Sequence, residues 1–313
     1  MQTIGTPIMW GVFVVLVIVA IMVDLLVLRQ HGPHKVSARE AMLWSLAWIV
    51  LAALFNLGLW YYLQPLGGDL ADRVALEFLT GYLVEKALAV DNIFVFLMLF
   101  TYFSVPAEHQ QRALILGVIG AILLRAVMIL IGAALIAEFH WILYVFGAFL
   151  LITGAKMLWA TGQENEFGEN PLLRFLRRHI PVTAGMHGER IWVIEHGKRV
   201  FTPLFIVLVM IGITDVIFAV DSIPAIFAIT TDPFIVLTSN VFAVLGLRAL
   251  YFLLADMQER FHLLAYGLAL VLMFIGAKML LVEFYKIPIA ISLAIVTATI
   301  ATAMVTSVLV PKR

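Results

Sequence analysis

The stretch Glu85–Asn92, which reads EKALAVDN, places two carboxylates and a carboxamide in a segment that is largely apolar from Leu76 to Phe103. The same pattern returns as DVIFAVDS at Asp215–Ser222. In both copies an acid is followed by five residues, an aspartate and a small polar residue. Because an ionised carboxylate in hydrocarbon costs at least about 2.5–3.5 kcal/mol, four such groups in two matched places predict a functional site.

The composition is typical of a protein that crosses a membrane many times. Of the 313 residues, 63% are hydrophobic, whereas soluble domains contain roughly 45–50%. The chain contains no cysteine, which excludes disulfides and thiolate metal sites. The first segment lacks the basic start and cleavage site of a signal peptide, so we interpret it as a retained anchor.

Runs of about 20 apolar residues predict an all-α, polytopic membrane protein of about nine transmembrane helices. The helices are expected near Ile8–Leu28, Ala41–Leu63, Leu76–Phe103, Ala113–Ile136, Trp141–Ala160, Pro203–Ile229, Phe234–Leu254, Leu263–Phe284 and Pro288–Val310.

Lys and Arg are distributed unevenly between the predicted loops. With the segment after the first span placed in the cytoplasm, alternation puts thirteen basic residues on that side and two, Arg73 and Lys286, on the other. Cytoplasmic loops carry an excess of Lys and Arg. The N-terminus is therefore predicted to lie outside and the C-terminus in the cytoplasm.

The segment 161–201 is the longest polar loop and is predicted to be cytoplasmic. Asn170 and Pro171 are typical of a helix start, and the run LLRFLRRHI that follows has leucines on one side and arginines on the other. This pattern predicts a short basic amphipathic helix on anionic lipid, or else a solvated linker. The run RIWVIEHGKRVF alternates around a glycine, which predicts a β-hairpin.

The similarity between the two halves extends beyond the acidic motifs. Arg125 has a counterpart in Arg248, and the run GAKM at Gly154–Met157 recurs at Gly276–Met279. Each copy covers three predicted spans, so the second copy enters the membrane from the opposite side. We therefore predict an inverted repeat, with its site near the midplane where the repeats meet. The predicted divisions are two N-terminal spans (1–75), repeat 1 (76–160), the loop (161–201), repeat 2 (202–285) and a last span (286–313).

The geometry of the motifs leaves open whether they form one ion site or two. Glu85 and Asp91 are separated by about 9 Å along a helix and by about 120° around it. If the two helices cross at mid-membrane, we expect Glu85 to face Asp221 and Asp91 to face Asp215. Pro224 removes a backbone hydrogen bond beside Asp221, which predicts a distortion of that helix.

The donors in the motifs are hard oxygens, from carboxylate, amide, hydroxyl and backbone carbonyl groups. Such sites favour Mn²⁺, Ca²⁺ or Mg²⁺ over Zn²⁺ or Cu⁺. The candidate metal ligands are Glu85, Asp91, Asn92, Asp215, Asp221 and Ser222.

Other polar residues in the spans need partners. Arg125 and Arg248 are expected to form ion pairs with the four acids, although two arginines cannot neutralise four carboxylates. A purely structural network of salt bridges is the alternative. Asp24 is expected either to reach the interface or to join the site, and Asn240 to make an interhelical hydrogen bond. Two lysines that close their helices, Lys156 and Lys278, are expected to snorkel.

The stretches LVEKALAVDNIFVF and DVIFAVDSIPAIFAITTDPFIVLTSNVFAVLGLRALYFLL resemble the TerC family of bacterial membrane proteins, named from tellurium resistance. The runs GTPxxWGVF, WYYLQ and FLTGYLVEK are most similar to its pH-responsive Alx branch. The resemblance covers nearly the whole chain. It implies an inner-membrane protein with a LysE-superfamily-like fold, a link to manganese export, and an ion site formed by the acids of the two motifs. Some relatives are linked instead to calcium or to membrane-protein assembly.

Together these features predict a transporter, not an enzyme, that exports a divalent metal cation, preferably Mn²⁺, by alternating access. No resident cofactor and no nucleic-acid partner are expected. Proton exchange on the same carboxylates is the expected coupling. The alternatives are a Ca²⁺ or proton pathway through these carboxylates, and a non-transporting membrane scaffold that docks partners on the loop 161–201. The chain has no GxxxxGK[ST] run, so ATP-driven pumping by this chain alone is not expected.

Overall fold

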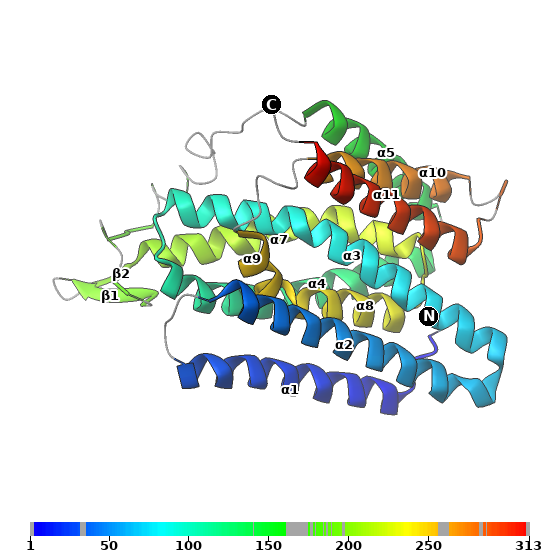
Figure 1. Ribbon diagram of the computed structural model, residues 1–313, viewed down its shortest axis with the longest axis horizontal. Coiled ribbons are helices and arrows are strands. Elements are labelled where there is room, and N and C mark those ends of the chain that lie inside the picture. The colour runs from blue at the N-terminus through cyan, green and yellow to red at the C-terminus, as the bar shows by residue number, and fades with distance from the viewer. Residues whose placement is uncertain are drawn as a thin grey trace.

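In the computed structural model, long helices run side by side along the long axis of the molecule (Figure 1). The structure describes residues 3–31, 36–139, 141–160, 175, 178, 180–183, 185, 187–188, 190–195, 198–255, 263–281, 284–285 and 287–310.

The described part of the chain consists mainly of helices joined by short links, with a β-hairpin ahead of the second half. In order, the elements are α1 (Pro7–His31), α2 (Ala38–Leu63), the 3₁₀ helix η1 (Gln64–Leu66), α3 (Gly68–Tyr102), α4 (Ala107–Glu138), α5 (Ile142–Ala160), β1 (Trp192–Glu195), β2 (Lys198–Phe201), α7 (Pro203–Phe227), α8 (Pro233–Leu245), α9 (Leu247–Ala255), α10 (Leu264–Leu280) and α11 (Ile289–Leu309).

Local side-chain chemistry determines where several helices begin. Ser37 precedes α2, and its hydroxyl accepts a hydrogen bond from the Glu40 amide at 3.2 Å, as N-cap residues do. The carboxylate of Asp232 caps α8 in the same way, accepting from the Phe234 amide at 2.9 Å. Gly67 has a φ of 142°, which glycine adopts readily, and it turns the chain from η1 into α3.

Six helices in the described part of the chain are long and apolar enough to cross a membrane, namely α1, α2, α4, α5, α7 and α11. The consecutive helices α8 and α9, bent by 42°, make a seventh if they count as one span. A helical, multi-pass membrane architecture is therefore confirmed. The nine-span prediction requires that α3 and α10 also cross; α3 carries the charged motif, and α10 is apolar but has only 17 residues.

The helices form layers that bring both acidic motifs into the middle of the molecule. In Figure 1, α1 and α2 lie along one side, and α5, α10 and α11 lie along the other. Between them, α8 packs on α3 and α4, while α4 also packs on α7. Every residue of α8 is buried, as expected for a helix that is apolar nearly all round. Helices α3 and α7, which carry the motifs, thus contact each other and share neighbours.

A helix break lies in the span after α7, where the sequence did not predict one. Helix α7 continues through Pro224 to Phe227, whereas the next span bends at Gly246, between α8 and α9. There the Lys86 ammonium donates to the Ala243 carbonyl oxygen at 3.0 Å. The last carbonyls of a helix lack intrahelical partners, so a lysine from α3 supplies one. A Cβ on Gly246 would lie 2.7 Å from this ammonium, so glycine leaves room for it.

The hairpin predicted in the polar loop is confirmed. Strands β1 and β2 pair antiparallel, with Trp192 opposite Phe201. The Arg199 guanidinium lies 4.9 Å from the centre of the Trp192 ring, a cation–π contact. The amphipathic helix predicted over 171–180 lies outside the described residues, apart from positions 175, 178 and 180.

Candidate functional site

A buried guanidinium joins the two acidic motifs. Arg125, in the middle of α4, is 1% exposed. Its Nη2 and Nε donate to the two carboxylate oxygens of Asp215 on α7, at 2.9 and 3.2 Å. Its Nη1 donates to Oε1 of Glu85 on α3. The planar fork of arginine suits such bidentate contacts, and this one side chain binds the first acid of each motif.

Two neutral side chains complete this network. Asn240 of α8 is fully buried; its Nδ2 donates to Glu85 Oε2 at 3.0 Å, and its Oδ1 accepts from Arg125 Nη1 at 3.3 Å. The Ser222 hydroxyl of α7 accepts from the same Nη1 at 3.5 Å. The interhelical hydrogen bond expected for Asn240 is confirmed. The network connects α3, α4, α7 and α8.

The network contains more acidic than basic groups. Glu85 and Asp215 are both buried, and they share the single positive charge of Arg125. A buried ion pair is tolerated when further hydrogen bonds satisfy its remaining lone pairs, as Asn240 does for Glu85. With both carboxylates ionised, one negative charge remains uncompensated within these three residues. The site therefore attracts a further cation or a proton.

A cavity of about 250 Å³, here called the inner cavity, adjoins the network between α3, α5, α7 and α10. The carboxylate of Asp221, the second acid of the repeated motif, lines it and hydrogen bonds to the Thr153 hydroxyl of α5. Lys156, which is exposed, lines the same cavity. The polar residues that line the inner cavity include Glu85, Asn92, Arg125, Lys156, Asp221 and Ser222.

The side chain of Asn92 has an unused acceptor in this cavity. Asn92 is 2% exposed, and its Oδ1 has no hydrogen-bond partner. Leaving a buried polar group unpaired costs about 1–3 kcal/mol. A carboxamide oxygen is also a ligand that hard cations accept. The orphaned oxygen of Asn92 therefore indicates where a cation or a donor group fits.

The described residues test one half of the acid pairing predicted from helix crossing. Glu85 and Asp221 do line one cavity, but the carboxylate of Glu85 binds Arg125 together with Asp215. The sequence predicted Asp215 opposite Asp91. Helices α3 and α7 meet near the first acids of the motifs, where one guanidinium satisfies both. Asp91 lies in α3, and its side chain is outside what the structure describes.

The second arginine does not join the acids of the motifs as predicted. Arg248 of α9 donates from Nη2 to Asp24 Oδ1 of α1 at 2.6 Å, and both side chains are buried. Asp24 therefore neither reaches the interface nor enters the site. The bend at Gly246 begins α9 just before Arg248 and sets its direction apart from that of α8. This ion pair ties the N-terminal helix to the second half of the chain.

Comparison with known proteins identifies the family. The model described as "Integral membrane protein TerC family" matches residues 70–313. This chain belongs to the TerC family. The family expected from the motifs is confirmed.

Several curated relatives of this TerC protein match it over nearly their full length. It is 57% identical over 297 residues to "Putative membrane-bound redox modulator Alx" of Escherichia coli K12, covering 95% of this chain and 92% of the relative. The protein of the same name from Photorhabdus laumondii is 52% identical over 313 residues, covering 100% and 98%. An uncharacterized membrane protein of Myxococcus xanthus is 43% identical over 307 residues, covering 98% and 94%. No solved structure matches the chain.

The acidic side chains that the structure describes in this TerC protein do not converge into a carboxylate cage. Among the side chains that the structure describes, no group of three or more His, Cys, Asp or Glu is placed to hold a metal ion. Glu85 and Asp215 bind the guanidinium of Arg125, while Asp221 and Asn92 face the inner cavity. The first acids of both motifs thus have an internal cation as their counter-ion.

Thr153 and Lys156 line the inner cavity, although neither was predicted to belong to the site. Both come from α5, which carries no acidic motif. The repeated GAKM run, which contains Lys156, was the available signal.

Proposed function

We propose that this TerC-family protein exports a divalent metal cation, preferably Mn²⁺, from the cytoplasm by alternating access. The observation that carries the proposal is the inner cavity, where the carboxylate of Asp221, the orphaned Oδ1 of Asn92 and the hydroxyl of Ser222 line one space inside an apolar bundle. Oxygen donors of this kind suit Mn²⁺, Ca²⁺ and Mg²⁺. Of the other candidate ligands, Glu85 lines the same cavity, and Asp215 binds the guanidinium of Arg125, which also lines it.

Arg125 supplies the mechanism of this proposal. Its guanidinium is the shared counter-ion of Glu85 and Asp215 while no metal is bound. A divalent cation that enters the inner cavity competes for the same carboxylates. When the cation leaves, the guanidinium returns, so the carboxylates are never left unpaired in a medium where that is costly. Metal binding requires deprotonated carboxylates, and exchange of protons on Asp221 is the coupling we propose.

The packing of α5 on α10 supports an inverted repeat. A Cβ on Gly154 would lie 2.8 Å from the Ala269 carbonyl oxygen, and one on Gly276 would lie 2.7 Å from the Gly147 carbonyl oxygen. The later glycine of α5, Gly154, faces the earlier residue of α10, Ala269, and Gly147 faces Gly276, so the two helices run antiparallel. The register that aligns Gly154 with Gly276 also aligns Gly147 with Ala269. The two contacts therefore interchange when the repeats are interchanged, as a two-fold axis requires.

The other helix contacts follow the same symmetry. Helix α3 packs on α8 as α7 packs on α4, and these two contacts interchange under the repeat. In this arrangement α3 is the counterpart of the apolar span α7, and α10 is the counterpart of α5. We therefore include α3 and α10 among the spans, which gives the nine crossings and the LysE-superfamily-like organisation expected from the sequence.

The proposed location is the bacterial inner membrane, with the N-terminus outside and the C-terminus in the cytoplasm. The excess of Lys and Arg on one side of the predicted spans supports this orientation. The curated relatives described above are bacterial.

Manganese loading of cells tests the proposal. A bacterial strain without manganese exporters receives wild type, Asp221→Asn, or the control Asp69→Asn, which changes an exposed acid at the start of α3. Wild type and the control should lower the intracellular Mn²⁺ measured after loading. Asp221→Asn should leave it as high as the empty vector does, because an amide lacks the charge that holds the cation. Equal Mn²⁺ with wild type and with empty vector would overturn the proposal.

The alternatives are separated by purified protein in liposomes that contain metal and pH dyes. Ca²⁺ flux without Mn²⁺ flux would change the cargo, and proton flux without metal flux would make the protein a proton pathway. A scaffold would show no flux at all. The Alx relatives are named for redox modulation, but this chain has no thiol with which to exchange electrons. An effect on redox balance would follow here from the level of the transported metal.

A further inference from the structure

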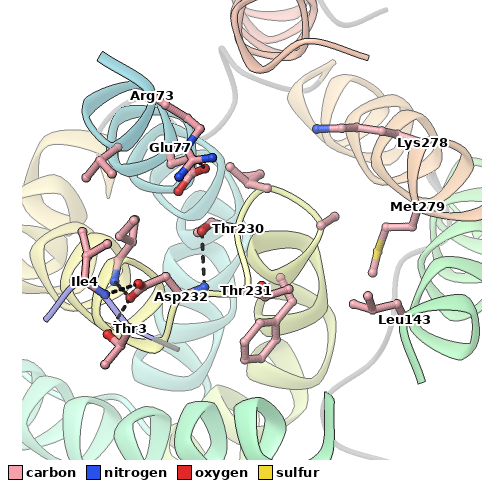
Figure 2. Close-up of a pocket in the computed structure, with 15 residues that line it drawn as sticks. Thr3, Ile4, Arg73, Glu77, Leu143, Thr230, Thr231, Asp232, Lys278 and Met279 are labelled. Atoms are coloured by element: carbon pink, nitrogen blue, oxygen red, sulfur yellow. Dashed lines mark hydrogen bonds and ion pairs between the residues drawn. The ribbon is translucent and has the colours of Figure 1, made fainter. Parts of the chain in front are cut away.

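A second cavity, of about 550 Å³, lies among α3, α10 and the link between α7 and α8. Figure 2 shows Arg73 and Glu77 on α3, Lys278 across the cavity on α10, and Thr230–Asp232 in the link. In the orientation that we propose, this is the extracytoplasmic end of the bundle, so it is called the outer cavity. Nothing in the proposed function uses these residues.

The inner and outer cavities lie toward opposite ends of the antiparallel pair α5 and α10. Lys156, near the end of α5, lines the inner cavity, and Lys278, near the end of α10, lines the outer one. These lysines occupy the same position of the repeated GAKM run. Each repeat thus contributes its lysine to one of the two cavities.

A layer of buried apolar side chains separates the cavities. Val84 of α3, Leu150 of α5, Ala225 of α7 and Ile275 of α10 are at most 3% exposed and belong to one apolar cluster. On each of these four helices, the residue lies in the chain between residues that line the inner cavity and residues that line the outer cavity. Apolar constrictions of this kind exclude water and ions. The two cavities are therefore the two sides of one closed barrier.

The two acids of the outer cavity, Asp232 and Glu77, differ in how far their carboxylates are already bound by other groups. Asp232 is occupied: its Oδ2 accepts from the Ile4 amide at 2.6 Å, and it caps α8. Glu77 hydrogen bonds to the Thr230 hydroxyl, and its contact with a cation is the long one of 3.8 Å with Arg73, whose side chain is 61% exposed. An exposed ion pair of this length contributes little. Lys278 is the other cation that acts on the Glu77 carboxylate. Glu77 is thus the carboxylate that a cation in the outer cavity can bind.

We propose that the outer cavity is the release vestibule of the transport pathway, where Glu77 receives the hydrated divalent cation after the apolar layer opens. Lys278 is the counter-ion that restores neutrality when the cation leaves. A liquid water molecule occupies about 30 Å³, so a cavity of 550 Å³ has room for a cation with its first hydration shell. This inference rests on the proposed function and adds the residues of the outward half of its pathway.

The absence of cysteine from the natural chain allows a direct test. Thr231, which is exposed and lines the outer cavity, is changed to Cys. Spheroplasts loaded with Mn²⁺ are treated from outside with a membrane-impermeant trimethylammonium methanethiosulfonate. The added positive charge should slow Mn²⁺ efflux about tenfold, because like charges placed together oppose each other strongly. Efflux by untreated Thr231→Cys should match wild type.

The matched control is Leu66→Cys. Leu66 is 70% exposed and lies in η1, just before α3, but it does not line the outer cavity. The same reagent should modify it from the same side without slowing efflux. Complete modification of Thr231→Cys, shown by mass spectrometry, with unchanged efflux would overturn the vestibule.

A second variant, Glu77→Gln, tests the carboxylate itself. Efflux should fall about tenfold, as expected when one charge-assisted contact is lost. The affinity of the purified protein for Mn²⁺, obtained from the metal-induced rise in Tm, should change by less than about twofold. Unchanged efflux would refute the role of Glu77, and equal losses of binding and efflux would place Glu77 in the main site instead.

The results distinguish failure of the vestibule from failure of the proposed function. If wild type carries no Mn²⁺, both fail. If wild type and Leu66→Cys carry Mn²⁺ and Asp221→Asn does not, the proposed function stands. In that case, normal efflux by both Glu77→Gln and modified Thr231→Cys removes the vestibule alone.

Discussion

Glu85 and Asp215 lie 130 residues apart in the chain and bind the same guanidinium, that of Arg125. They are the first acids of the two repeated motifs, so equivalent positions of the two copies meet here. In inverted repeats, equivalent positions approach each other at the interface between the copies, where transport sites lie. An arginine at this point is a cation that belongs to the protein and cannot be exported.

Removing this guanidinium should destabilise the metal-free protein and increase the stabilisation that added Mn²⁺ provides. In Arg125→Gln, two buried carboxylates lose their common partner, and breaking a buried ion pair costs about 3–5 kcal/mol. Mn²⁺ then meets no internal competitor. The rise in Tm on adding Mn²⁺ should therefore be larger in this variant than in wild type, as measured by thermal unfolding of purified protein.

The double variant Arg125→Gln with Asp215→Asn is the control for that experiment. It leaves one unpaired carboxylate fewer, so it should recover part of the stability lost in Arg125→Gln. It should not show the enlarged response to Mn²⁺, because a ligand has been removed. Equal Mn²⁺ responses in wild type and Arg125→Gln would show that the arginine does not compete with metal.

The unpaired oxygen of Asn92 predicts opposite effects on stability and on transport. In Asn92→Leu, a buried acceptor without a partner is replaced by an apolar group of similar shape. The free energy of unfolding should stay the same or rise by up to about 1–3 kcal/mol. Mn²⁺ efflux should be lost, because a candidate ligand is gone.

Asn240→Leu is the matched comparison, since Asn240 is equally buried but makes two hydrogen bonds to charged partners. This variant should lose about 1.5–3 kcal/mol for each bond that involves a charged group. Chemical unfolding in detergent measures both variants. A loss of stability in Asn92→Leu as large as that in Asn240→Leu would mean that Asn92 already has a structural partner.

The ion pair between Asp24 and Arg248 should contribute to stability and not to metal binding. Asp24→Asn leaves Arg248 buried without its counter-charge, which should cost about 3–5 kcal/mol. The double variant Asp24→Asn with Arg248→Met should be more stable than the single one, because no charge is left unpaired. The response of Tm to Mn²⁺ should match wild type in the double variant. A weakened response would connect α1 to the site.

The sequence correctly predicted a helical, multi-pass membrane protein, because each strong signal was local or repeated. Apolar runs located the helices, and the hairpin followed from alternation around a glycine. The acidic motifs could be matched to each other because intramembrane acids are rare and costly. The family followed from long motifs that include those acids.

Contacts between distant helices were less predictable. The ion pair between Arg248 and Asp24 depends on the bend at Gly246, which the sequence did not indicate. The sequence instead suggested a distortion at Pro224, in helix α7, which the structure shows as one continuous helix. Pro224 lacks the amide hydrogen that would bond to the Val220 carbonyl, yet α7 continues past it to Phe227. The apolar layer and the outer cavity were also unforeseen, because they depend on which faces of four helices meet.

The glycines between α5 and α10 provide a test of the internal symmetry. Gly154→Ala and Gly276→Ala would each place a methyl group within 3 Å of a backbone carbonyl of the facing helix. Overpacking of this kind costs about 1–3 kcal/mol, and the two losses should be similar if a two-fold axis relates the contacts. Gly58→Ala in α2 is the control, since a Cβ there has nothing within 4 Å. That change should raise stability by roughly 0.5–1 kcal/mol, the helix preference of alanine over glycine. Chemical unfolding measures all three, and a loss in only one of the α5 and α10 variants would show that the contacts are not equivalent.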